Sequence, residues 1–73
     1  MKKGYRYITT IVENDYLYLR PEDTPAYIWC VKTFGHEDNE YFRNYYAGWK
    51  YLGNGTYGFK SKYKNMIFKL RWL

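Results

Sequence analysis

The residues best suited to catalysis or metal binding gather in one short stretch. The only dense group of titratable side chains comprises His36, Glu37, Asp38 and Glu40, and an active site needs such groups to converge. The His-Glu pair lacks the second histidine of a zinc-binding HExxH motif, and Cys30 is the only cysteine, which excludes a CxxC pair. Acidic residues are also favourable at the start of a helix. We therefore interpret the stretch as a helix N-terminus and expect no enzyme, no metal site and no cofactor.

Binding to a polyanion or an acidic surface is the second chemistry that the residue types allow. Residues 48–73 carry six cations and no acid, whereas residues 1–47 carry six cations and all seven acids. Aromatic rings stack on unpaired bases while lysine and arginine contact phosphates, which holds single-stranded nucleic acid without sequence readout. The candidate residues for binding a partner or nucleic acid are Trp49, Lys50, Tyr51, Lys60, Lys62, Tyr63, Lys64, Lys69 and Arg71.

The exposure of these rings depends on which face of one hairpin is buried. A two-residue turn at Asn54-Gly55 pairs Leu52 with Tyr57. If Leu52 and Tyr57 face the core, Trp49 and Tyr51 form an exposed platform with cations around them. In the opposite alternative Trp49 and Tyr51 are buried, which the frequent burial of indole rings slightly favours.

Tyrosine is the unusual component of the composition. The chain has 73 residues, and 25% of them are aromatic, with 11 tyrosines, 4 phenylalanines and 3 tryptophans. A chain of this size builds one small core, so we expect a single domain over residues 1–73 and neither a multidomain enzyme nor a repeat array. So many tyrosines exceed what one core encloses. The remainder are expected on the surface, where tyrosine serves recognition.

Most of the chain is predicted to form β-strands. Tyr5–Val12 and Tyr16–Arg20 are rich in β-branched and aromatic residues and flank turn formers, which predicts a hairpin. A second hairpin surrounds Asn54-Gly55, a dipeptide that tolerates the positive φ angles of a type I′ turn. Lys62–Asn65 is expected to form a turn, and Met66–Leu73 alternates apolar and polar residues as a half-buried strand does.

Two segments before the second hairpin carry helical signals. Ala26–Phe34 is interpreted as a buried strand because strand formers dominate it, although Thr24-Pro25 and Gly35 would suit the two ends of a short helix. His36–Ala47 is predicted as a helix of about three turns that ends at Gly48. The expected fold class is α+β, with five or six mostly antiparallel strands, forming an open sheet or a partial barrel, and one helix.

The sequence also predicts a location. Pro25–Val31 is the longest uncharged and mostly apolar stretch, and it is far shorter than the roughly 20 residues that span a bilayer. Charged and polar residues interrupt the apolar run near the N-terminus, which argues against a signal peptide. A single cysteine suits a reducing compartment. We expect an intracellular, cytoplasmic protein that does not contact membranes.

In size and composition the chain resembles the small accessory proteins of phages and mobile elements, among them inhibitors of host defence such as anti-CRISPR proteins. The resemblance covers no motif, so it assigns no residue a role. The surplus of tyrosines and the charges of both signs lead us to expect a non-enzymatic binding protein that occludes a protein partner through exposed tyrosines and two charged edges. The resemblance implies that this partner is a host nucleic-acid-handling or defence enzyme. The alternative is a nucleic-acid-binding module that uses a basic, aromatic sheet face. A homodimer through an exposed strand edge such as Met66–Leu73 is a further expectation.

Overall fold

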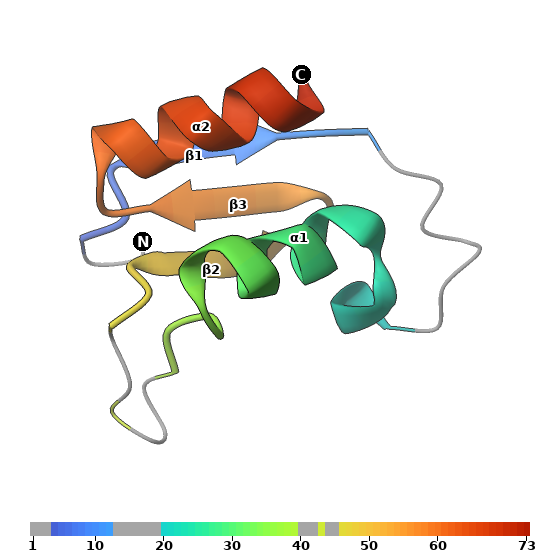
Figure 1. Cartoon of the computed structure of the whole chain (residues 1–73), viewed down its shortest axis with the longest axis horizontal. Helices are drawn as coiled ribbons and strands as arrows, with labels where there is room; N and C mark the ends of the chain where they lie inside the picture. The colour runs from blue at the N-terminus through green and yellow to red at the C-terminus, as the bar shows by residue number, and fades with distance from the viewer. Residues whose placement is uncertain (1–3, 13–19, 40–42, 44–45) are drawn as a thin grey trace.

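A three-stranded antiparallel sheet forms one layer of the molecule, and two α-helices cover one of its faces (Figure 1). The computed structural model describes residues 4–12, 20–39, 43 and 46–73. The strands are β1 (Tyr7–Thr10), β2 (Trp49–Gly53) and β3 (Thr56–Phe59), and β3 lies between the other two. The expectation of five or six strands with one helix is wrong, because the described residues form three strands in an open sheet and two α-helices.

The first α-helix, α1 (Pro25–Phe34), replaces the strand predicted for Ala26–Phe34. A short 3-10 helix, η2 (Pro21–Asp23), precedes it, and the Thr24 hydroxyl donates a hydrogen bond to the Pro21 carbonyl at 2.7 Å. Gly35 ends the helix with a φ of 98°, which glycine adopts without steric cost. Both ends of the segment carry helix signals, and packing of α1 against the sheet overrides the preference of its interior residues for strands, since intrinsic propensities are weak.

The second α-helix, α2 (Lys62–Trp72), replaces the turn and the strand predicted for the C-terminal segment. Ser61 caps it, because the Ser61 hydroxyl oxygen accepts the backbone N–H of Lys64 at 3.3 Å. Asn65, Phe68 and Trp72 face the core with the spacing of one helical face. The predicted dimer edge at Met66–Leu73 is therefore wrong, since this segment offers no strand edge.

The hairpin at Asn54-Gly55 is confirmed, and both residues have the positive φ angles, 51° and 75°, expected of its turn. Its register differs from both alternatives, because Tyr51 rather than Leu52 lies opposite Tyr57. A β-bulge at Leu52 inserts one residue into β2, and such an insertion moves the following side chains to the other face. Trp49 and Tyr51 consequently share the inner face with Tyr57.

The core consists mainly of aromatic rings. Its largest fully buried apolar side chains are Trp49, Tyr57, Phe59 and Phe68. Phe68 of α2 lies 4.8 Å from the ring of Tyr57, and Tyr27 of α1 lies 5.2 Å from that of Trp49, measured between ring centroids. Both helices thus contact the same face of the sheet, and tyrosines contribute to the core as the composition led us to expect.

Two other predicted elements are only partly within the described residues. β1 confirms a strand inside Tyr5–Val12, but its partner is β3, and residues 16–19 of the other predicted arm lie outside the described residues. The helix predicted for His36–Ala47 is wrong over residues 36–39, where the Asp38 N–H donates to the Trp49 carbonyl at 2.9 Å. Residues 40–42 and 44–45 lie outside the described part. Neither α1 nor α2, the α-helices of that part, has the length and apolar character needed to cross a membrane.

Candidate interaction surface

The aromatic residues predicted to form a stacking platform lie mostly inside the protein. Trp49 has an exposed fraction of 0%, and its indole N–H donates to the Gly35 carbonyl at 2.8 Å. Tyr51 is half-buried, and its hydroxyl accepts the Gly55 N–H at 3.0 Å. An exposed platform built on Trp49 is therefore wrong, because a buried indole has no face left for a base.

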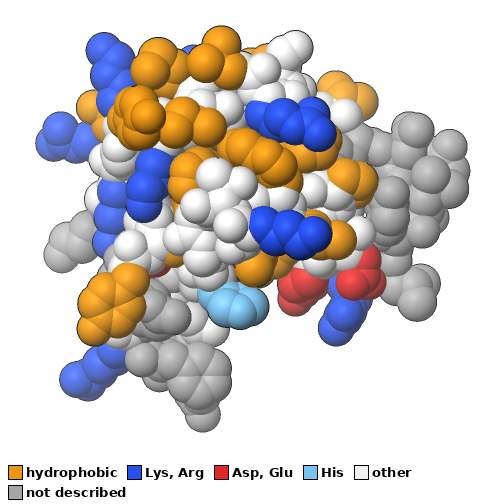
Figure 2. All heavy atoms as spheres, viewed as in Figure 1, with side chains coloured by type: hydrophobic (Ala, Val, Ile, Leu, Met, Phe, Trp, Pro, Cys, Tyr) orange, Lys and Arg blue, Asp and Glu red, His pale blue; other side chains and the backbone are white. Residues whose placement is uncertain are grey.

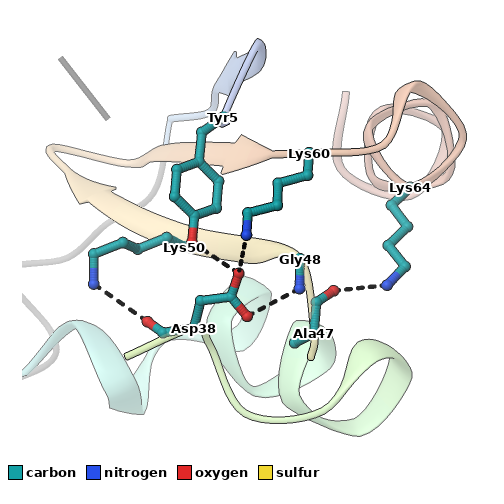
Figure 3. Close-up of polar contacts among 7 residues, drawn as sticks. All are labelled: Tyr5, Asp38, Ala47, Gly48, Lys50, Lys60 and Lys64. Atoms are coloured by element: carbon teal, nitrogen blue, oxygen red, sulfur yellow. Dashed lines mark hydrogen bonds and ion pairs between the residues drawn. The ribbon is translucent and has the colours of Figure 1, made fainter. Parts of the chain in front are cut away.

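Three of the predicted lysines contact polar groups of the chain itself, as Figure 3 shows. Lys60 Nζ lies 3.7 Å from the Asp38 carboxylate, and Lys50 Nζ donates to the Asp38 backbone carbonyl at 3.3 Å. Lys64 Nζ donates to the Ala47 carbonyl at 2.6 Å. These contacts orient the three side chains toward the loop that precedes β2 and leave less of their charge available to a partner.

Asp38 is the centre of this polar cluster, and its exposed fraction is 1%. Its Oδ2 accepts the Tyr5 hydroxyl at 2.7 Å, and its Oδ1 accepts the Gly48 N–H at 3.0 Å. A buried carboxylate needs such donors, since an unpaired charge away from water is costly. Asp38 thus joins the N-terminal segment and β3 to the start of β2, and its role is structural.

The neighbouring Glu37 is also held by the fold. Its carboxylate accepts the Tyr27 hydroxyl at 2.6 Å and the Tyr51 N–H at 2.9 Å. Burial of the phenol, together with this hydrogen bond to Glu37, raises the pKa of Tyr27 above its ordinary value. His36 is exposed, and in the described part of the chain no three His, Cys, Asp or Glu side chains come together as metal ligands would.

The remaining predicted residues, Lys62, Tyr63, Lys69 and Arg71, are exposed and lie on α2. They surround apolar side chains that also face solvent. The exposed fractions of these side chains are 65% for Tyr63, 49% for Met66, 81% for Leu70 and 74% for Leu73. We call these seven residues the α2 surface: Lys62, Tyr63, Met66, Lys69, Leu70, Arg71 and Leu73.

The α2 surface has an apolar centre and a basic border. An α-helix turns about 100° per residue, so residues three or four positions apart lie along one stripe. The stripe from Tyr63 to Leu73 faces away from Phe68. Lys62 and Lys69 lie on one side of it, and Arg71 lies on the other. Figure 2 shows hydrophobic side chains along the edge occupied by α2, with lysine and arginine beside them.

Met66, Leu70 and Leu73 are the members of this surface that the sequence analysis missed. A strand over Met66–Leu73 assigns Met66 and Leu70 to the core. The signal that finds them is the serine cap at Ser61 combined with helical spacing, which separates a buried stripe from an exposed one.

A shallow groove adjoins the α2 surface. It has a volume of about 450 Å³ and lies between α1 and the C-terminal end of α2, with Trp29, Lys32, Arg71 and Trp72 among its lining residues. The rings of Trp29 and Trp72 are 6.3 Å apart in an edge-to-face arrangement. The Arg71 guanidinium lies 4.5 Å from the Trp72 ring, so this side chain borders both the groove and the apolar stripe.

No family model matches the chain, and comparisons with curated proteins and with solved structures found no match. The functional argument therefore rests on the residues of this chain. Among the described residues, the α2 surface combines the largest group of exposed apolar side chains with predicted binding residues.

Proposed function

We propose that this chain is a non-enzymatic binding protein that occludes a protein partner and contacts it through the α2 surface. The observation that carries the proposal is the stripe of exposed apolar side chains from Tyr63 to Leu73, bordered by cations. Exposed apolar patches with polar rims mark interaction sites in folded proteins. An apolar centre with a charged rim is also the usual anatomy of a protein interface.

The charges of the chain define the kind of partner. Because Lys62, Lys69 and Arg71 border the stripe and residues 48–73 carry no acid, the α2 surface repels basic surfaces and attracts acidic ones. The matching surface is an apolar groove or helix face bordered by Asp and Glu side chains. Charge complementarity of this kind mainly accelerates association and selects the partner, while the apolar stripe supplies burial.

The proposed partner is a host nucleic-acid-handling or defence enzyme, and the proposed location of the chain is intracellular. The small size and composition of the chain support the proposed partner. The intracellular location is supported by the single cysteine, Cys30, which is buried and suits a reducing compartment.

Direct binding of nucleic acid is the second candidate. It is favoured by three exposed cations, Lys62, Lys69 and Arg71, on the same helix as the exposed ring of Tyr63. A phosphate backbone would, however, leave Leu70 and Leu73 at the centre of the contact without an apolar partner. Counterion release makes such binding strongly dependent on salt concentration.

The test compares two substitutions on the α2 surface with one elsewhere. The wild-type chain is used to isolate a partner from a lysate, the partner is purified, and the affinity of each variant for it is measured. Leu70→Glu places an acid in the apolar stripe and is expected to weaken binding by at least about tenfold, which corresponds to about 1.4 kcal/mol. Lys69→Gln is expected to weaken binding mainly at low salt. Val12→Ser alters an apolar side chain outside the surface, with an exposed fraction of 100%, and should bind as the wild type does.

Equal affinity of the wild type and of the Leu70→Glu variant for the purified partner would contradict the α2 surface as the contact. Fluorescence anisotropy with a single-stranded oligonucleotide tests the second candidate. Loss of oligonucleotide binding in Lys69→Gln, with no effect of Leu70→Ser, would favour nucleic acid over a protein partner. Circular dichroism of each variant checks that the fold is retained.

A further inference from the structure

Within the described residues, the sheet has one covered edge and one open edge. β2 forms the covered edge, where the Asp38 N–H donates to the Trp49 carbonyl at 2.9 Å and the Tyr51 N–H donates to the Glu37 carboxylate at 2.9 Å. β1 forms the other edge, and β3 is its single neighbour in the sheet. The two edges of this small sheet are therefore not equivalent.

The ladder between β1 and β3 determines which backbone groups of β1 face outward. The Ile11 N–H donates to the Gly55 carbonyl at 2.9 Å, so the alternation of an antiparallel ladder directs the groups of Thr9 toward β3 as well. The N–H and C=O groups of Ile8 and Thr10 then face away from β3. They form a row of hydrogen-bonding groups on the open edge.

This edge lacks several of the features that keep edge strands apart, although β1 is short, with four residues, and Arg6 precedes it. From Tyr7 to Val12 the sequence contains no charged residue and no proline, and either would discourage pairing. The Ile8 side chain is 48% exposed and that of Val12 is 100% exposed. The β-bulge of the sheet lies in β2, so it does not twist the open edge away from a partner.

We propose that β1 pairs in antiparallel orientation with β1 of a second copy of this chain, about a two-fold axis at Thr9. This register places Ile8 opposite Thr10 of the second copy, and Arg6 opposite Val12. In this symmetric arrangement, the outward N–H and C=O groups of Ile8 in each copy pair with those of Thr10 in the other. The same patch serves both copies, as a two-fold interface requires.

The choice of a second copy over a fibre follows from the one open edge that the described residues leave. A chain with two open edges can add copies without limit, whereas a chain with one is complete at two. Pairing also covers part of Ile8 and Val12, which lie on the sheet face opposite to Thr9, because side chains alternate along a strand. The dimer would contain one continuous six-stranded sheet.

Salt concentration separates this dimer from the contact made by the α2 surface. Each copy has a formal net charge of +5, so two copies repel and screening by salt strengthens their association. Binding of the α2 surface to an acidic partner weakens with salt instead. The dimer needs no partner protein, so its failure and the failure of the proposed function are measured separately.

Amide hydrogen exchange of the full chain, followed by NMR at micromolar and at millimolar concentration, tests the pairing. The Ile8 and Thr10 amides are expected to exchange at least about tenfold more slowly at the higher concentration, while the Thr9 and Ile11 amides are protected at both. Equal rates for Ile8 and Thr10 at the two concentrations would overturn the proposal. Fast equal rates mean an unpaired edge, and slow equal rates mean that the chain covers the edge itself.

Light scattering at millimolar concentration tests the position of the interface. Ile8→Lys places a charge on the open edge and is expected to leave a monomer, whereas Leu70→Lys adds the same charge on α2 and should remain a dimer. Thr10→Pro removes an outward N–H without breaking the ladder to β3, and it should also give a monomer. A wild type that stays monomeric at high salt, or a dimer abolished by Leu70→Lys alone, would contradict the pairing of β1.

Discussion

The carboxylate of Asp38 accepts the backbone N–H of Gly48 at 3.0 Å, although the two residues are 10 positions apart in the sequence. Asp38 is buried, and its other oxygen accepts the Tyr5 hydroxyl at 2.7 Å. Gly48 immediately precedes β2, so the carboxylate holds the start of this strand next to the N-terminal segment. The position of Trp49 in the core depends on that arrangement.

Asp38→Asn is expected to lower the free energy of unfolding by about 1.5–3 kcal/mol, because the amide keeps the shape of the side chain but removes its charge from hydrogen bonds. The ion pair with Lys60 adds little, since the Lys60 side chain is 38% exposed. Urea unfolding measures the change. Asp23→Asn is the control, because it breaks the exposed pair with Arg20 and should cost less than about 1 kcal/mol. Equal effects of the two substitutions would contradict the structural role of Asp38.

Gly55→Ala is expected to be more destabilising than Gly53→Ala. Both glycines have positive φ angles, 75° and 101°, so each substitution carries backbone strain of about 1–3 kcal/mol. A Cβ at Gly55 would also overlap the backbone carbonyl oxygen of Ile11. A Cβ at Gly53 would have no heavy atom within 4 Å apart from the residues next to it in the chain. Thermal unfolding of the two variants gives the comparison. A Gly53→Ala variant as unstable as Gly55→Ala would show that strain alone accounts for both.

Local signals in the sequence predicted the hairpin turn correctly but did not decide between helix and strand for α1 and α2. The dipeptide Asn54-Gly55 specifies its turn through two positive φ angles, which few residue pairs tolerate. For α1, the residues at the two ends indicated a helix while the interior indicated a strand, and contacts with the sheet decide the outcome. For α2, Phe68 and Trp72 fit both an alternating strand and a helical face, so their spacing does not separate the two structures.

The register of β2 could not be predicted from the sequence. The bulge at Leu52 requires space on the outer face, and Gly58 provides it, since a Cβ at Gly58 would lie 3.0 Å from Leu52 Cδ1. The bulge also allows Trp49 and Tyr51 to pack on the inner face, against Tyr27 of α1. These contacts join distant parts of the chain. The sequence left open whether Trp49 is buried or exposed, and packing in the core decides for burial. Lys62, Tyr63, Lys69 and Arg71 are exposed, but they lie on a helix and not on the predicted turn and strand.

Thr9→Val is expected to destabilise the protein by about 1–3 kcal/mol, because it leaves a buried amide oxygen without its donor. The Thr9 hydroxyl donates to Asn65 Oδ1 at 2.6 Å, in the buried contact between β1 and α2. Unfolding in urea of Thr9→Val, Asn65→Ala and the double variant yields the coupling energy of the pair. Thr10→Val is the matched control, since the Thr10 hydroxyl contacts Thr56 on the exposed face and should change stability by less than about 0.5 kcal/mol. A coupling energy near zero would argue against the hydrogen bond.

Tyr27 makes the stability of the protein depend on pH in the alkaline range. Its pKa is raised in the folded protein by burial and by the hydrogen bond to Glu37, whereas an unfolded tyrosine ionises near its ordinary value of about 10. Above that pH the unfolded chain releases a proton that the folded chain retains. The contribution of Tyr27 to stability is therefore fully present below about pH 10 and declines as the pH rises from there toward the pKa of the folded state.

Tyr27→Phe isolates this effect. Between about pH 10 and the higher pKa of the folded state, the wild type should lose stability relative to the variant by up to about 1.4 kcal/mol per pH unit, which is the slope for one proton. Guanidinium unfolding of both proteins at several pH values between pH 8 and pH 11 measures the difference, and ionisation of the other tyrosines affects both proteins alike. Parallel loss of stability in the two proteins would mean that the folded state does not retain the Tyr27 proton, which would contradict the buried contact with Glu37.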